Sequence, residues 1–243
     1  MIGMQPRLAG LTAAIVVAAA ANGLLSAAAP TAVDSLAKLK TGNARFVSNP
    51  QDALPISAAR RTDLTKGQTP FATILSCADS RVPPEVVFHT GLGDLFVVRA
   101  AGNITDKAIL ASVEYSVEHL NVPLVVVMGH ESCGAVKAAL DTPIGTSLGP
   151  NLDYLIKAIR PSVIATASKP ASERMRAAIL ENVEETLNDM IADSALLRDL
   201  GSKGHVTFVG AYYELGSGKV YFSEPVSLAG SSAQAPRPTG GHN

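Results

Sequence analysis

Short apolar runs alternate with longer amphipathic stretches along most of the chain. The first run is continuous rather than alternating, which is typical of a strand in a sheet that is covered on both faces, and the third run is the most apolar. The last two are joined by Gly-Ser-Gly, which is a hairpin signal. We therefore expect five strands, at residues 71–76, 94–99, 123–128, 205–215 and 219–223.

The stretches between these runs carry apolar residues at helical spacing. Asp34 or Ser35 could cap the first helix, and Pro83 with Pro84 suits the start of one helical turn better than the middle of a helix. The last stretch is expected to form one long, charged helix. The expected helices are 31–46, 57–66, 106–120, 133–140, 151–167 and 171–200.

Strands that alternate with helices indicate an α/β fold. We expect a mostly parallel central sheet flanked by helices, with an N-terminal helical arm formed by the first helix. In such a sheet the carboxyl ends of the strands meet along one edge, where ligands usually bind. The residues that directly follow the strands are therefore the candidates for a binding or catalytic site.

The N-terminal residues 1–28 have the order of a secretory signal: Arg7, then an uncharged Ala-rich run, then small residues. We expect cleavage after Ala28, followed by a single α/β domain at 29–228 and a disordered polar tail at 229–243. The protein would then be exported, to the periplasm or the medium, without stable membrane association.

An uncleaved membrane anchor is the alternative for this N-terminal segment. Asn22 and Gly23 interrupt the apolar run. The uninterrupted part is then about 14 residues, which is short for a bilayer span. The pattern favours cleavage over anchoring.

Composition places the 243-residue chain among compact globular proteins, since 47% of its residues are hydrophobic and 17% are charged. The formal net charge is −1, and no basic patch with interleaved aromatic residues stands out. We therefore expect no nucleic-acid partner.

Two polar motifs directly follow expected strands. Cys77, Asp79 and Arg81 follow the first strand at alternate positions, so in an extended chain they share one side. His130 and Cys133 follow the third strand, three residues apart. Two thiols, an imidazole and a carboxylate make four potential ligands, and this donor set favours zinc over magnesium or calcium.

These motifs also carry a family resemblance. CADSR together with GHESCGAV resembles the β-class carbonic anhydrases, and SLAKLKTGNARFV, VVRAAGN and VEYSVEHLNV are similar to the corresponding stretches of that family. The resemblance spans about residues 34–225. It implies one zinc per chain with Cys77, His130 and Cys133 as ligands, and an Asp79–Arg81 dyad.

The resemblance further implies reversible hydration of carbon dioxide to bicarbonate and a proton. Three protein ligands leave a position for water, whose pKa zinc lowers toward about 7, and the zinc-bound hydroxide attacks carbon dioxide. Asp79 would orient that water and Arg81 would hold Asp79 ionised. Without this pair Asp79 could become a fourth zinc ligand, as the resemblance implies for some members. A homodimer or a higher homo-oligomer is also implied.

The chain departs from the family pattern at Ala100, where the family commonly has Asn. The hydrogen bonding of that loop is therefore expected to differ.

A structural protein and a cysteine hydrolase are the two alternatives to a zinc enzyme. An exported structural protein with a Cys77–Cys133 disulfide would leave Asp79, Arg81 and His130 unexplained. A hydrolase with Cys133 as nucleophile would leave Cys77 idle, and Gly134 directly after Cys133 breaks the Gly-x-nucleophile-x-Gly pattern.

Overall fold

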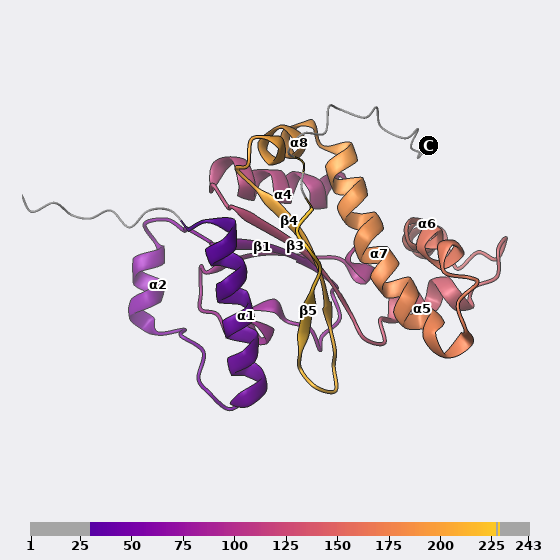
Figure 1. The fold of residues 1–243 in the computed structure, drawn as a ribbon, viewed down its shortest axis with the longest axis horizontal. Coiled ribbons are helices and arrows are strands. Elements are labelled where there is room, and N and C mark those ends of the chain that lie inside the picture. Colours follow the sequence, from indigo (N-terminus) through magenta and orange to yellow (C-terminus); the bar gives the residue numbers. More distant parts are fainter. Residues whose placement is uncertain (1–29, 227, 229–243) are drawn as a thin grey trace, which may run out of the picture.

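The computed structural model describes residues 30–226 and residue 228. Its centre is one sheet with the strand order β2-β1-β3-β4-β5, in which β5 is antiparallel to β4 and all other neighbours are parallel (Figure 1). This architecture confirms the expected α/β fold. The strands are β1 (Ala72–Ser76), β2 (Leu95–Arg99), β3 (Leu124–His130), β4 (Thr207–Tyr213) and β5 (Val220–Phe222).

The helices follow the expected order, with one difference. The expected helix 171–200 is two helices, because Ser194 leaves helical geometry and its side chain accepts a hydrogen bond from the Leu197 amide, which caps a new helix. The helices are α1 (Ala32–Ser48), α2 (Ala58–Leu64), α3 (Pro84–Val87), α4 (Lys107–His119), α5 (Gly134–Asp141), α6 (Pro150–Ala165), α7 (Ala171–Asp193) and α8 (Ala195–Ser202), with a 3-10 turn η1 (Ala101–Asn103).

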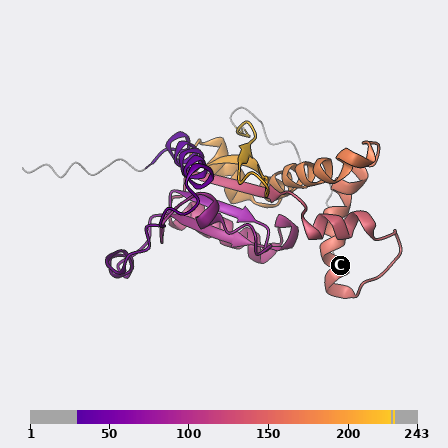
Figure 2. The same cartoon turned by 90° about the horizontal axis from the view of Figure 1, so that it is seen from below.

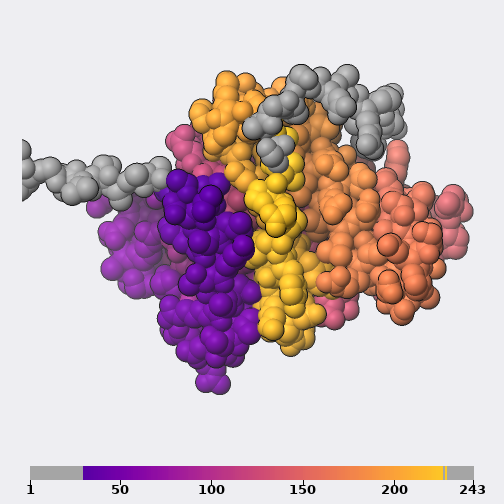
Figure 3. All heavy atoms as spheres, viewed as in Figure 1, coloured from indigo at the N-terminus to yellow at the C-terminus, as the bar shows by residue number. Residues whose placement is uncertain are grey.

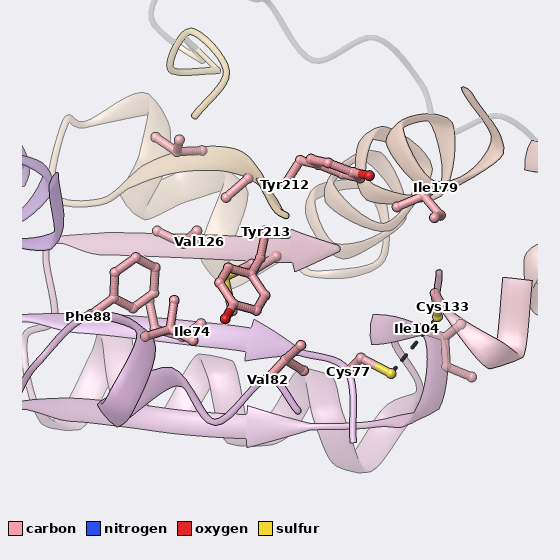
Figure 4. Close-up of a cluster of buried hydrophobic side chains, with 14 of the residues drawn as sticks. Ile74, Cys77, Val82, Phe88, Ile104, Val126, Cys133, Ile179, Tyr212 and Tyr213 are labelled. Carbon is pink, nitrogen blue, oxygen red and sulfur yellow. Dashed lines mark hydrogen bonds between the residues drawn. The ribbon is translucent and has the colours of Figure 1, made fainter. Parts of the chain in front are cut away.

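Helices cover both faces of the sheet, which is why its central strands are apolar throughout. On one face, β-strand residues such as Val125 and Val127 pack against α4, α7 and α8. On the other face, Ile74 and Val126 pack with Phe88, as Figure 4 shows, and with Leu39 of α1. The burial of β1 and β3 on both faces confirms the reading of their continuous apolar runs.

Helices also extend the molecule beyond the sheet at two ends. Figure 2 shows α2 standing apart at one end, while α5 and α6 gather at the other. No residue of α2 is buried. Within residues 30–226, no helix combines the length and the hydropathy that a bilayer span requires.

Helix α1 is held to the sheet by a close backbone contact and a buried amide. Asn43, 6% exposed, donates to the carbonyls of Val87 and Gly218 and accepts from the amide of Val220. These bonds join α1 to the β4–β5 hairpin, and the two lie side by side in Figure 3 (indigo and yellow). One turn of α1 therefore fixes both the chain around α3 and the hairpin.

Gly42 makes this close approach possible. A Cβ atom at residue 42 would collide with the backbone carbonyl of Phe88. We expect Gly42→Ala to lower the free energy of unfolding by at least about 2 kcal/mol, since overpacking against backbone cannot relax by a rotamer change. Urea unfolding measures the loss. Gly216→Ala is the control, because a Cβ there has open space, and an equal loss in both variants would contradict the explanation.

Candidate metal centre

The sheet brings the two sequence motifs together at its carboxyl edge. β1 and β3 are parallel neighbours with Ser76 opposite Met128, so the residues that follow Ser76 lie beside the end of β3. β3 continues two residues beyond the expected end at Met128, because its pairing with β4 extends to His130 opposite Tyr213. His130 is therefore held within a strand rather than on a loop.

A tight turn then carries the chain from His130 to the second thiol. Ser132 has a φ of 54°, in the left-handed region that a non-glycine residue rarely occupies. Cys133 follows as the N-cap residue of α5, with an extended backbone. The turn reverses the chain so that Cys133 faces the end of β1.

Cys77, His130 and Cys133 converge, each of them buried, with one ligand atom from each lying within 4.8 Å of the others. The two Sγ atoms are 4.0 Å apart, as the dashed line in Figure 4 marks, and both cysteines are free thiols. Cys77 and Cys133 therefore do not form the disulfide that the structural-protein alternative requires. Cys133 is also only 1% exposed, which leaves little access for a nucleophile that attacks an external substrate.

The two thiols differ in their electrostatics. The hydrogen bond from Cys133, with smaller contributions from His130 and backbone amides, outweighs burial and lowers the pKa of Cys77 to about 4. The same sulfur contact and burial raise the pKa of Cys133. The contact thus couples the two sulfurs electrostatically, and both thiols would give up their protons on binding a metal cation between them.

His130 presents an unpaired nitrogen to the same space. Its Nδ1 lies 2.9 Å from the Glu131 carbonyl oxygen, which selects the tautomer with hydrogen on Nδ1 and a lone pair on Nε2. That Nε2 is buried and has no hydrogen-bond partner among the described residues. A buried lone pair beside two sulfurs is a fit for a thiophilic metal such as zinc.

Asp79 and Arg81 form a pair beside these three residues. The Arg81 guanidinium donates from Nε to Oδ1 at 2.8 Å and from Nη2 to Oδ2 at 2.7 Å. This fork, followed by the Arg81 backbone amide, holds the pKa of Asp79 well below its usual range despite partial burial. Asp79 Oδ2 lies 3.9 Å from His130 Nε2. The carboxylate thus borders the cluster while it is bound to Arg81.

Three supporting residues have no obvious signal in the two motifs. Arg99, the last residue of β2, donates to the carbonyl oxygens of Cys77 and Asp79 at 3.0 and 2.6 Å. Gly102 donates its amide to Cys77 Sγ at 3.3 Å, and Asn182 of α7 donates to the Gly102 carbonyl. For Asn182 a signal existed: it is an amide on the apolar stripe of an expected helix.

Glu131 and His119 do not belong to the cluster of ligand atoms. The Glu131 Oε2 accepts from the amides of Leu215 and Gly216. The His119 side chain is 60% exposed and lies beside the Tyr115 ring, with the ring centroids 5.1 Å apart and the ring planes tilted by 54°.

A mostly parallel α/β sheet with two thiols and an imidazole at its carboxyl edge offers the donor set that thiolate-ligated metalloenzymes use. The comparisons give the family. Residues 72–220 match the carbonic anhydrase family. Carbonic anhydrase 2 of Mycobacterium tuberculosis is 39% identical over 193 residues, which covers 79% of this chain and 93% of that protein. The carbonic anhydrase of Mycolicibacterium smegmatis is 39% identical over 188 residues, covering 75% and 88%.

Solved structures agree in fold. One of two tetrameric β-carbonic anhydrases from Sordaria macrospora superposes with a TM-score of 0.62 at 24% identity, covering 77% of this chain and 93% of that one. The chain therefore belongs to the β-class carbonic anhydrase family and is an enzyme of that family. The family membership confirms the resemblance that the two motifs indicated.

Proposed function

We propose that the chain catalyses the reversible hydration of carbon dioxide at one zinc ion held by Cys77, His130 and Cys133. Membership of the carbonic anhydrase family supports the reaction. The observation that carries the zinc assignment is the convergence of two buried sulfurs and an unpaired imidazole nitrogen. When bound, zinc supplies the Lewis acidity that makes water a nucleophile near neutral pH.

The protein residues set the charge of this centre. Two thiolates balance the double positive charge of zinc, so the centre is neutral. A neutral centre acidifies water less than one with three imidazoles, and activity should therefore rise into mildly alkaline pH. The Glu131 carbonyl fixes the ring of His130 so that Nε2 faces inward.

Asp79 and Arg81 would orient the attacking water. An ionised carboxylate accepts a hydrogen bond from that water and so aims its lone pair at carbon dioxide. Arg81 keeps Asp79 ionised and turned toward the guanidinium. In this proposal Asp79 is a fourth zinc ligand only when Arg81 releases it, and ligation would then block the position that the water needs.

The function is tested on purified protein by measuring zinc and carbon dioxide hydration together. We expect one zinc per chain and hydration that a strong chelator abolishes and zinc restores. Hydration by a preparation that contains no metal would contradict the proposal.

We further propose a homodimer or a higher homo-oligomer. The Sordaria macrospora neighbour is described as tetrameric, and the exposed α2 offers surface for such contacts. Light scattering after gel filtration gives the mass, and a monomer at micromolar concentration would contradict this proposal.

Export is proposed from the N-terminal sequence. Residues 1–28 lie outside the described residues, as does the tail at 229–243. The proposed domain, 29–228, begins just before α1, whose N-cap Thr31 exchanges hydrogen bonds with Asp34, so removal of the leader would leave the cap intact. We expect N-terminal sequencing of protein from the native host to begin near residue 29, in an extracytoplasmic fraction. An intact Met1 in the cytoplasmic fraction would contradict cleavage and export.

A further inference from the structure

Asn182 is a polar residue in an apolar environment. It lies on α7 and is 2% exposed, and its neighbours on the same helix face, Ala178 and Ile179, are 0% and 1% exposed. A buried amide at such a position is costly unless it is hydrogen-bonded. Its Nδ2 donates to the Gly102 carbonyl oxygen at 2.7 Å, across 80 residues of sequence.

Gly102 in turn contacts the metal centre. Its amide nitrogen is 3.3 Å from Cys77 Sγ, to which it donates. Gly102 has a φ of 66°, and a Cβ atom there would lie 2.7 Å from Ile159 Cδ1 and 3.1 Å from the Ala135 Cβ. The position therefore requires glycine, both for its backbone angle and for space. Glycine alone, however, leaves this turn free to rotate.

We propose that Asn182 is a positioning residue for the metal centre, which fixes the Gly102 turn so that its amide remains aimed at the Cys77 sulfur. Anchoring the carbonyl of Gly102 removes the rotational freedom that glycine would otherwise have. The amide then stabilises the thiolate form of Cys77, and hydrogen bonds of this kind tune metal binding through the ligand. The inference rests on the proposed zinc site and deepens it.

A purely structural role of Asn182 would lead to a different result. If Asn182 only satisfies a buried carbonyl, its loss would lower stability and leave the electronic state of the sulfur unchanged. The deciding measurements are therefore the zinc dissociation constant and the sulfur-to-cobalt charge-transfer band of the cobalt-substituted enzyme. A thiolate without its hydrogen bond is oxidised more easily, so this band should move to lower energy.

The variants are Asn182→Leu, which keeps the branching of the side chain at Cγ without its hydrogen-bonding groups, and Asn182→Ala, which avoids steric strain. Thr186→Val is the matched control, since Thr186 is a buried polar residue on the next turn of α7, 4% exposed. We expect both Asn182 variants to bind zinc about tenfold more weakly, the lower end of the loss seen for partners of metal ligands. We expect the band to shift in both and Thr186→Val to match the wild type.

A measurement on the wild-type protein does not depend on any variant folding. After substitution with cadmium-113, a scalar coupling between the metal and the Gly102 amide proton is expected through the N–H···S bond. Absence of this coupling, or folded Asn182 variants with wild-type affinity and band energy, would overturn the inference. If the wild type itself binds no zinc, the proposed function fails instead, so the two failures are distinguishable.

Discussion

Replacing Cys77 by Ser or His130 by Ala should remove zinc and carbon dioxide hydration together. Each change deletes one of three protein donors, and zinc in a catalytic site is rarely held by two. In either variant the two remaining donors lie in a buried cluster, and the neighbouring Asp79 carboxylate is engaged by Arg81. Hydration should fall to the uncatalysed rate. The zinc content and the rate of carbon dioxide hydration are measured for each purified variant.

The control for these variants is His119→Ala. His119 is also a histidine of the folded domain, but its side chain is 60% exposed and makes no contact with the cluster. This variant should keep one zinc per chain and full activity. Retention of stoichiometric zinc in both Cys77→Ser and His130→Ala would show that the metal is held elsewhere.

Replacing Arg81 by Ala should leave zinc in place and lower hydration at least tenfold. Arg81 is a donor only, so it cannot ligate a metal or take a proton, and it acts through Asp79. Without the guanidinium, Asp79 either loses its orientation or turns toward the metal. A tenfold loss corresponds to about 1.4 kcal/mol of barrier. Arg81→Lys should restore little, because an ammonium group cannot reproduce the planar fork.

A cycle of four proteins decides whether the two residues act as a unit. Asp79→Asn should also retain zinc and lose activity, and the double variant should be no worse than the worse single one. Arg61→Ala, a change in the exposed helix α2, controls for the loss of a surface arginine. If Arg81→Ala turns over at nearly the wild-type rate, the dyad has no catalytic role even where the zinc site is correct.

The strands could be predicted well because their signal is local. The run expected at 71–76 and the observed β1 (Ala72–Ser76) differ by one residue. Two of the differences in extent have separate causes. The break at Ser194 depends on a single cap, which the helical periodicity on either side conceals. The extension of β3 to His130 depends on pairing with β4, about 80 residues further along the chain, where no local pattern could show it.

Sequence alone determined which side chains are the candidates for the chemistry. The identity and spacing of Cys77, His130 and Cys133, and their places after apolar runs, are properties of short segments, and they also carried the family resemblance. Asp79 and Arg81 are also close in sequence, but they meet across a turn, in which the Val82 amide donates to the Asp79 carbonyl, and not along an extended chain.

Tertiary structure decided how these side chains are arranged. The strand order places β1 beside β3, so that Cys77 and Cys133 approach to 4.0 Å. The fold also brings Asn182 of α7 to the turn that supports the Cys77 sulfur. Strand order and the docking of α7 follow from the burial of apolar surface by distant segments, so the physical cause of these contacts lies in the packed core and not in any local stretch of sequence.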